Sequence, residues 1–219
     1  MVDLIHGLSA DRVHANLERA RGQIMAAGRD PSEVEILAAV KYLPTEELAA
    51  LAEGGITVVG ENRAQALAEK ADAMPGAFTW DFIGALQSRK VRDLVPRVRY
   101  IHSVATDSAL TQLGRHGTPA TEVLVEVNVA GEEGKSGIAP PDLEAFLERC
   151  PVHVVGLMTM PPYARDPEES RPHFAALRRL AERYGLSQLS MGTSQDFVVA
   201  VQEGATIVRL GTTLYRSAP

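Results

Sequence analysis

Short apolar runs alternate with longer amphipathic stretches along the chain. The apolar runs are rich in valine, isoleucine and leucine, and they have the length of strands covered on both faces of a sheet. The predicted strands cover residues 34–40, 56–60, 80–84, 100–104, 122–129, 152–158, 186–191 and 206–210. In the stretches between them, apolar residues recur at the spacing of a helix.

Helices are therefore predicted around and between these strands. The first is expected to end at Gly28 and Pro31, which interrupt helices. The second opens after Pro44, and we expect Thr45 to be its N-cap. The predicted helices cover residues 9–27, 45–53, 62–73, 87–94, 107–114, 140–150, 168–184 and 194–202, with a short helix from residue 212.

This alternation predicts an α/β protein with a parallel sheet. Eight strand–helix units with right-handed crossovers close naturally into a (β/α)8 TIM barrel. An open doubly wound sheet is the alternative, but it more often has a glycine fingerprint after its first strand. Residues 41–44, Lys-Tyr-Leu-Pro, occupy that place here. Since no linker or low-complexity tract divides the chain, we expect a single domain over residues 1–219.

Composition and charge narrow the classes of function. The formal net charge of −6 disfavours broad capture of nucleic acid or of an anionic membrane. Cys150 is the only cysteine, so no intrachain disulfide or cysteine-cluster metal site can form, and we expect no metal. The chain shows neither a signal-peptide pattern nor an apolar run that would span a bilayer. A cytoplasmic protein fits these features best.

Lys41 stands where the first predicted strand gives way to a loop. Lysine is rarely buried without a partner, so one interpretation is a solvated side chain at a strand end. The other is an amine that forms a Schiff base with an aldehyde.

Two turns that carry glycine and hydroxyl residues follow the last two predicted strands, at residues 190–196 and 209–213. TIM barrels often bind phosphate at this corner, through backbone N–H groups at helix starts. Each turn alone could be an ordinary N-cap, but two adjacent ones favour a phosphate site. Asp196 would then have to point outward, away from a dianion.

An amine beside a phosphate site suggests pyridoxal phosphate (PLP), whose aldehyde and phosphate lie on opposite sides of one ring. Arg209 could reach the pyridine nitrogen, although a surface salt bridge is the alternative for this residue. Because arginine only donates hydrogen bonds, it would favour an unprotonated ring nitrogen, which makes the ring a poorer electron sink.

Several short motifs occur in one order along residues 36–215. They are Ala39-Val40-Lys41, Gly60-Glu61-Asn62, Phe82-Ile83-Gly84 with Leu86-Gln87, Lys135-Ser136-Gly137, Gly156-Leu157-Met158, Ser190-Met191-Gly192 with Ser194 and Asp196, and Arg209-Leu210-Gly211-Thr212. In this order the chain resembles the pyridoxal phosphate homeostasis proteins, single-domain relatives of the alanine racemase N-terminal barrel.

The resemblance implies a role for each matching residue. Lys41 would hold the cofactor as an internal aldimine, and Arg209 would face the ring nitrogen. The residues implied to bind the phosphate are Ser194, Gly211 and Thr212. Those implied to line the pocket near the ring are Asn62 and Met158.

Simpler interpretations remain open for three of these positions. Asn62 could be a helix N-cap, Met158 ordinary core filling, and Lys135 a solvated lysine rather than an accessory amine. The chain also departs from the family pattern at four places. Asp81 stands where histidine is frequent, Thr193 replaces methionine, Tyr215-Arg216 replaces Phe-Gly, and Arg89 stands where asparagine is common.

The resemblance implies a carrier and regulator of PLP without a catalytic residue of its own, because the second domain that supplies a tyrosine acid/base in racemases is missing. Its expected partners are PLP and PLP-dependent apo-enzymes as recipients, and we expect a monomer or weak homodimer. The alternatives are a racemase-type PLP enzyme and a class I aldolase-like barrel that uses Lys41 directly. The loop 161–166 is a candidate lid.

Overall fold

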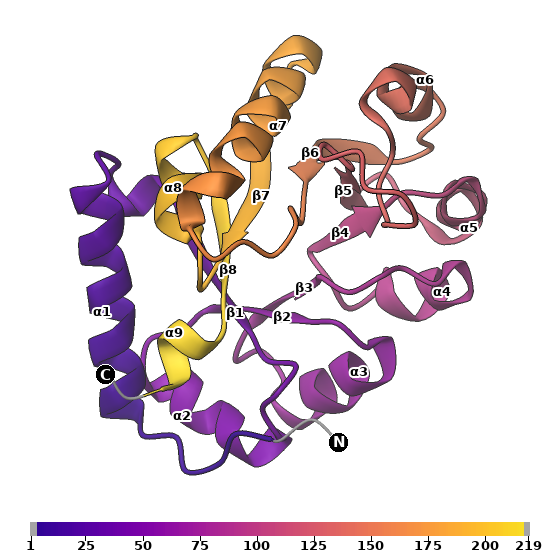
Figure 1. The fold of residues 1–219 in the computed structure, drawn as a ribbon. Coiled ribbons are helices and arrows are strands. Elements are labelled where there is room, and N and C mark those ends of the chain that lie inside the picture. Colours follow the sequence, from indigo (N-terminus) through magenta and orange to yellow (C-terminus); the bar gives the residue numbers. More distant parts are fainter. Residues whose placement is uncertain (1–3, 217–219) are drawn as a thin grey trace.

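Eight parallel strands close into a barrel, with helices on its outer side (Figure 1). The computed structural model describes residues 4–216. The strands follow one another in chain order around the barrel, and β1 pairs with β8, so the predicted (β/α)8 barrel is confirmed. The strands are β1 (Glu35–Ala39), β2 (Val58–Glu61), β3 (Thr79–Phe82), β4 (Tyr100–Val104), β5 (Glu122–Glu126), β6 (His153–Met158), β7 (Gln188–Thr193) and β8 (Ile207–Leu210).

The helices begin later than predicted, because short 3-10 turns precede several of them. The α-helices are α1 (Ala10–Ala26), α2 (Leu48–Glu53), α3 (Ala64–Ala73), α4 (Val91–Leu94), α5 (Asp107–His116), α6 (Leu143–Glu148), α7 (Arg171–Tyr184), α8 (Phe197–Gln202) and α9 (Thr212–Tyr215). The 3-10 turns are η1 (Pro31–Glu33), η2 (Thr45–Glu47), η3 (Ser88–Lys90), η4 (Pro140–Asp142) and η5 (Pro167–Ser170). Proline at the start of η1, η4 and η5 fits this position, since it needs no N–H partner there.

The predicted N-cap at Thr45 is wrong. The residue before η2 is Pro44, and no side chain caps this turn. The carboxylate of Glu47 instead contacts the segment before α1. It accepts hydrogen bonds there from the N–H groups of Gly7 at 2.7 Å and Leu8 at 2.8 Å. The start of α2 is therefore held by a long-range contact that a local sequence pattern does not contain.

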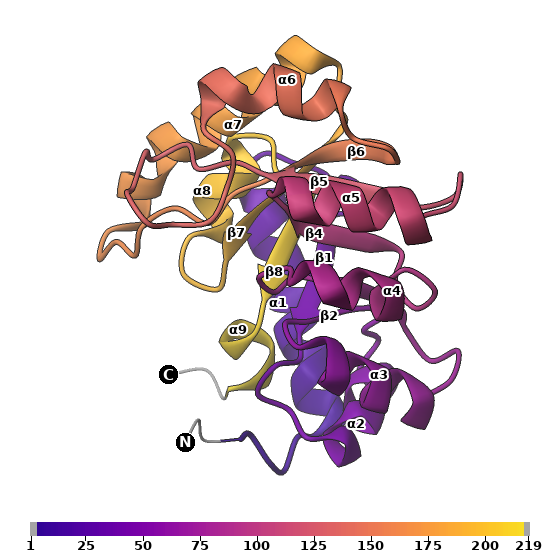
Figure 2. The ribbon, with the colours of Figure 1, turned by 90° about the vertical axis from the view of Figure 1, so that its right-hand side faces the viewer.

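Alternate residues of each strand serve two different cores. One face packs beneath the helices and forms the large outer core, to which Ala38 and Val40 belong. The other face fills the inside of the barrel, where Leu37, Val58 and Ile207 cluster. The inside also contains the buried polar side chains of Asp81, His102, Glu126, Ser190 and Arg209, of which Glu126 and Arg209 lie near the carboxyl ends of their strands. Figure 2 shows α9 and the loops after β5 and β6 on that side of the barrel.

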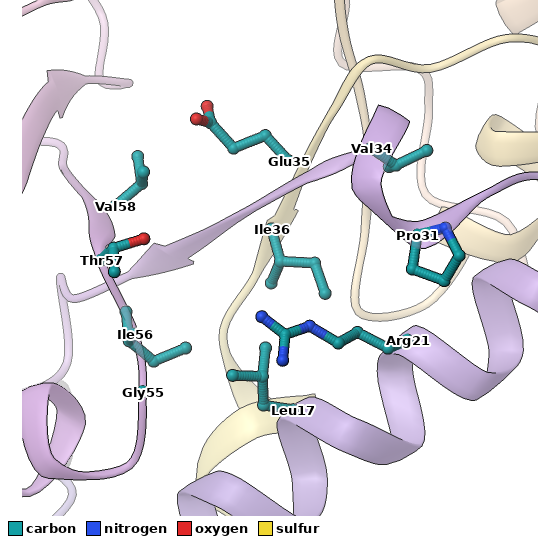
Figure 3. A pocket seen from close by; sticks show the side chains of 10 residues that line it. All are labelled: Leu17, Arg21, Pro31, Val34, Glu35, Ile36, Gly55, Ile56, Thr57 and Val58. Carbon is teal, nitrogen blue, oxygen red and sulfur yellow. The ribbon is translucent and has the colours of Figure 1, made fainter.

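The opposite end of the strands has a hollow of about 150 Å³ between α1 and the starts of β1 and β2 (Figure 3). Leu17, Ile36 and Ile56 line it together with Arg21, whose side chain lies along the hollow. It lies at the starts of the strands, whereas Lys41 follows the end of β1. It therefore does not belong to the site suggested by the sequence.

Close packing of β6 against β7 generates a prediction for Gly156. A Cβ at this position would lie 2.6 Å from the backbone carbonyl carbon of Gln188, so G156A should destabilise the barrel by about 1–3 kcal/mol. Gly22 on the exposed face of α1 has nothing within 4 Å, and G22A should stabilise the protein by about 0.5–1 kcal/mol. Urea unfolding of both variants measures the difference, and equal effects would contradict this account of Gly156.

Candidate functional site

Lys41 lies in the turn directly after β1, at the barrel end where the strands terminate. Ala38 pairs with Leu210, and a Cβ at Gly211 would be 3.8 Å from the carbonyl oxygen of Ala39. The turn that carries Lys41 therefore adjoins the turn after β8. Its half-buried amine lies 4.7 Å from the centre of the Tyr42 ring, and it has no hydrogen bond or ion pair with any other residue between 4 and 216.

A buried ion pair supports the backbone on either side of this position. The Lys70 amine donates to a carboxylate oxygen of Glu61 at 2.5 Å and to the carbonyl oxygen of Val40 at 2.7 Å. The second Glu61 oxygen accepts from the N–H of Asn62 at 2.7 Å. Because Val40 directly precedes Lys41, one ion pair fixes the backbone beside both Lys41 and Asn62. Sequence reasoning missed this pair, although Lys70 lies on the apolar side of a predicted helix.

Asn62 does not cap a helix, so that interpretation is wrong: the N-cap position of α3 is Arg63, and no side chain caps it. The Asn62 side-chain oxygen is buried and accepts no hydrogen bond within the described residues. Its backbone is packed against Gly84, where a Cβ would lie 2.6 Å from the Asn62 carbonyl carbon. An unpaired buried acceptor costs free energy, so this oxygen is suited to a donor on a bound ligand or water.

The turns after β7 and β8 meet as the sequence predicted. The hydroxyl of Ser194 accepts from the N–H groups of Gly211 at 3.1 Å and Thr213 at 3.2 Å. Thr212, the first residue of α9, is exposed beside them. A Cβ at Gly211 would have no neighbour nearer than 3.8 Å, which leaves room for an anion above the backbone. The structure thus brings together a hydroxyl and the N–H groups of Gly211 and Thr213, which donate to that hydroxyl here and would have to turn to a phosphate when one binds.

The expectation that Asp196 points outward is wrong. Asp196 is buried, and one carboxylate oxygen accepts from the N–H of Thr193 at 2.8 Å and from its hydroxyl at 3.0 Å. The other oxygen accepts from the Ser170 hydroxyl at 3.0 Å. These donors replace solvent around the carboxylate. They also give the hydroxyl of Thr193, one of the departures from the family pattern, a structural role.

Arg209 is only 6% exposed, which excludes the interpretation as a surface salt bridge. One terminal nitrogen of its guanidinium donates to the carbonyl oxygen of Ser190 at 2.8 Å and also to the Ser190 hydroxyl. The other donates to the carbonyl oxygen of Thr159 at 2.9 Å and to the sulfur of Met160. Within residues 4–216 the Nε–H makes no hydrogen bond, so this edge remains available to a ligand atom.

Burial lowers the pKa of Arg209 to about 10, although the nearby charges of Asp196 and Glu126 act in the opposite direction. The guanidinium therefore stays protonated at neutral pH. Glu126, at the end of β5, is a site residue that sequence reasoning missed. It accepts a hydrogen bond from the Ser136 hydroxyl at 2.8 Å, and burial raises its pKa.

Two further candidate residues lie in different surroundings. Met158 is buried inside the barrel, where it packs with Leu124 and Val155, as expected for core filling. Lys135 is exposed on the loop after β5 and forms an ion pair with Glu132, which is the arrangement expected of a solvated lysine.

The departure at Tyr215 also has a structural role. The hydroxyl of Tyr215 donates to the carbonyl oxygen of Ala39 at 3.1 Å, which ties α9 to the end of β1. Burial raises the pKa of Tyr215, so its hydroxyl stays protonated and remains a donor. Asn16 holds the next residue from α1, because its amide donates to the Arg216 carbonyl oxygen at 3.0 Å.

Metal-binding clusters and membrane-spanning helices are both absent from residues 4–216. No group of three or more histidine, cysteine, aspartate or glutamate side chains there could hold a metal ion. No helix in the same part of the chain is long and apolar enough to cross a membrane.

Comparison with known sequences identifies relatives that span nearly the whole chain. The chain matches the family model of the alanine racemase N-terminal domain over residues 8–219. A pyridoxal phosphate homeostasis protein of Aquifex aeolicus is 39% identical over 221 residues, which cover 94% of this chain and 97% of the relative. One from Pseudomonas aeruginosa is 36% identical over 216 residues, covering 94% of each chain.

Solved structures with a similar fold also cover nearly the whole chain. PipY of Synechococcus elongatus, solved with PLP bound, is 28% identical with a TM-score of 0.80, covering 93% of this chain and 100% of PipY. Alanine racemase of Corynebacterium glutamicum is 15% identical with a TM-score of 0.76, covering 100% of this chain and 64% of the racemase. The second similarity concerns the fold alone.

The ion pair of Glu61 and Lys70 generates a prediction about stability. K70M should cost about 3–5 kcal/mol, because it leaves the Glu61 carboxylate buried without its cation. K90M removes an exposed lysine that lies 3.8 Å from Asp93, and it should change stability by no more than about 0.5 kcal/mol. The free energy of unfolding in urea measures both, and a K70M value close to that of K90M would refute the assigned role.

Proposed function

The chain belongs to the family of the alanine racemase N-terminal domain, and on this premise we propose that it binds pyridoxal 5′-phosphate and serves intracellular PLP homeostasis. The observation that carries the proposal is the meeting of Ser194 and Gly211 beside the turn of Lys41. The chain that carries this site is similar to PLP homeostasis proteins over 94% of its length, which supports the same function.

We propose a distinct role for each group in the site. The amine of Lys41 holds the cofactor through a covalent bond to its aldehyde carbon. Ser194, Gly211 and Thr212 donate hydrogen bonds to the phosphate oxygens, and Arg209 presents its Nε–H to the ring nitrogen. Asn62 offers its unpaired side-chain oxygen to the ring side of the pocket, with Met158 below as filling. When bound, the cofactor supplies an electrophilic aldehyde and an electron-withdrawing ring.

The same geometry supports carriage rather than turnover. A racemase needs a proton donor on each face of the ring. The Tyr215 hydroxyl is engaged with Ala39, and its raised pKa makes it a poor acid. We propose a cytoplasmic monomer or weak homodimer that passes PLP to PLP-dependent apo-enzymes.

The racemase-type alternative has one observation in its favour. Glu126 is a buried carboxyl with a raised pKa at the end of β5, and it is the group that such a reaction would use as an acid or base. The aldolase-like alternative requires only Lys41, and the spectrum of the protein separates it from both PLP functions.

The covalent role of Lys41 predicts a spectrum. Protein mixed with PLP should show a visible absorbance band, and borohydride should attach the label to the peptide that contains Lys41. K41A should lose the band while keeping its far-ultraviolet circular dichroism, because the change lies in a turn. K135A should keep the band, since Lys135 is an exposed loop lysine. A band that persists in K41A, or one that is lost in K135A, would refute the assignment.

The carrier function predicts a kinetic result. Purified protein loaded with PLP should not racemise or decarboxylate amino acids at the rates of ordinary enzymes, about 1 s⁻¹ or more. Chiral chromatography of a mixture of small amino acids after incubation measures this. Turnover at such rates, lost in E126Q but kept in K135A, would establish the racemase-type function instead.

A further inference from the structure

A relay of buried polar side chains runs through the barrel interior from Arg209 toward the opposite end. The Ser190 hydroxyl, which contacts the Arg209 guanidinium, lies 2.8 Å from Nδ1 of His102. Nε2 of the same ring lies 3.1 Å from a carboxylate oxygen of Asp81. His102, Asp81 and Ser190 are each 0% exposed. Of these four residues, Arg209 alone belongs to the site proposed above.

The far end of this relay is an ion cluster. Arg99 donates to Asp81 at 2.6 Å and 3.1 Å, and to the two carboxylate oxygens of Glu35 at 2.6 Å and 2.8 Å. The N–H of Tyr100 also donates to Asp81 at 3.2 Å. Although burial opposes ionisation, the hydrogen bonds from His102 and Arg99 hold the pKa of Asp81 below its ordinary value. Asp81 is therefore a fixed carboxylate that can only accept hydrogen bonds.

The Asp81 carboxylate sets the direction of each hydrogen bond between Asp81 and Arg209. Burial lowers the pKa of His102 more than the Asp81 carboxylate raises it, so the ring is neutral and carries one proton. Because Asp81 only accepts, that proton is on Nε2, and Nδ1 is an acceptor. The Ser190 hydroxyl must then donate to Nδ1. A lone pair of its oxygen consequently faces the N–H of Arg209, which can only donate.

We propose that Asp81 and His102 are positioning residues for Arg209: they fix the direction of the Ser190 hydroxyl and so hold the guanidinium with its Nε edge toward the cofactor ring. The inference rests on the proposed PLP function. It gives a role to Asp81, one of the positions at which the chain departs from the family pattern. Asp81 acts through His102 and Ser190, and it does not touch the cofactor.

The D81N variant reverses the relay without removing a side chain. The carbonyl oxygen of the introduced amide suits the position that accepts from both Arg99 and the Tyr100 N–H. The amide N–H₂ then faces Nε2 of His102 as a donor and forces the ring proton onto Nδ1. It also replaces the oxygen that accepts from Arg99 at 2.6 Å, so D81N loses that hydrogen bond as well. The hydroxyl of Ser190 receives two donors and can no longer donate to the ring.

Two measurements test the proposal. Nitrogen-15 NMR of the His102 ring, in protein without PLP, should show the proton on Nε2 in the wild type and on Nδ1 in D81N. PLP titration should show a dissociation constant about 5- to 20-fold higher in D81N, the loss expected when one hydrogen bond to a charged group is weakened. E35Q is the matched control, because Glu35 contacts Arg99 but not His102. It should keep the wild-type tautomer and an affinity within about twofold.

The S190A variant keeps the test decisive if D81N does not fold. It removes the hydroxyl, while Arg209 retains its bond to the carbonyl oxygen of residue 190. S190A should weaken PLP binding as D81N does and leave the ring proton on Nε2. The double variant should bind PLP no more weakly than the weaker single variant, because Asp81 acts through the hydroxyl.

Several results would overturn the inference. They are a wild-type proton on Nδ1, PLP affinity in D81N and S190A equal to that of E35Q, or fully additive losses in the double variant. The NMR result separates this inference from the PLP function. A reversed wild-type tautomer in a protein that binds PLP refutes only the positioning role, whereas a protein with the expected tautomer that takes up no PLP refutes the proposed function.

Discussion

Pairing of β1 with β8 brings together the turns after these two strands, which are far apart in the sequence. Lys41 follows β1 and Gly211 follows β8, and the register that opposes Ala38 to Leu210 puts their turns side by side. The hydroxyl of Tyr215 fastens the same junction from α9 to the carbonyl oxygen of Ala39. An open sheet with the same elements would leave β1 and β8 unpaired. The amine and the phosphate donors can therefore meet only because the barrel closes.

Closure of the barrel also buries charged side chains away from water. Each of the buried charges named below has hydrogen-bond partners at fixed positions. Arg209 has two carbonyl oxygens and a hydroxyl, Glu61 has Lys70 and backbone N–H groups, and Asp196 has donors from Thr193 and Ser170. A buried charge without such partners would cost several kcal/mol. The apolar packing beneath the helices offsets these costs.

The strand pattern and the barrel were predictable from the sequence, because hydrophobic runs report directly which segments are covered on both faces. The meeting of the turns that carry Ser194 and Gly211 was predictable for a similar reason, since loops at the ends of parallel strands gather at one face. The orientation of Asp196 and the contact by which Glu47 holds the start of α2 were not. Both depend on partners distant in the chain, such as Ser170 and Leu8. The contact between Lys70 and Val40 could not be predicted for the same reason, because the two residues are 30 positions apart.

The protonation of Arg209 links the barrel interior to the proposed function. A guanidinium whose pKa is about 10 remains a donor throughout the physiological range, so it cannot give a proton to a ring nitrogen. Under the proposed function, the ring nitrogen is then held unprotonated and the bound cofactor is a weak electron sink. A carboxylate in this place would instead stabilise a protonated ring, which is a stronger electron sink. An interior that rigidly orients a donor, rather than an acceptor, therefore limits how strongly the ring of a bound cofactor can withdraw electrons.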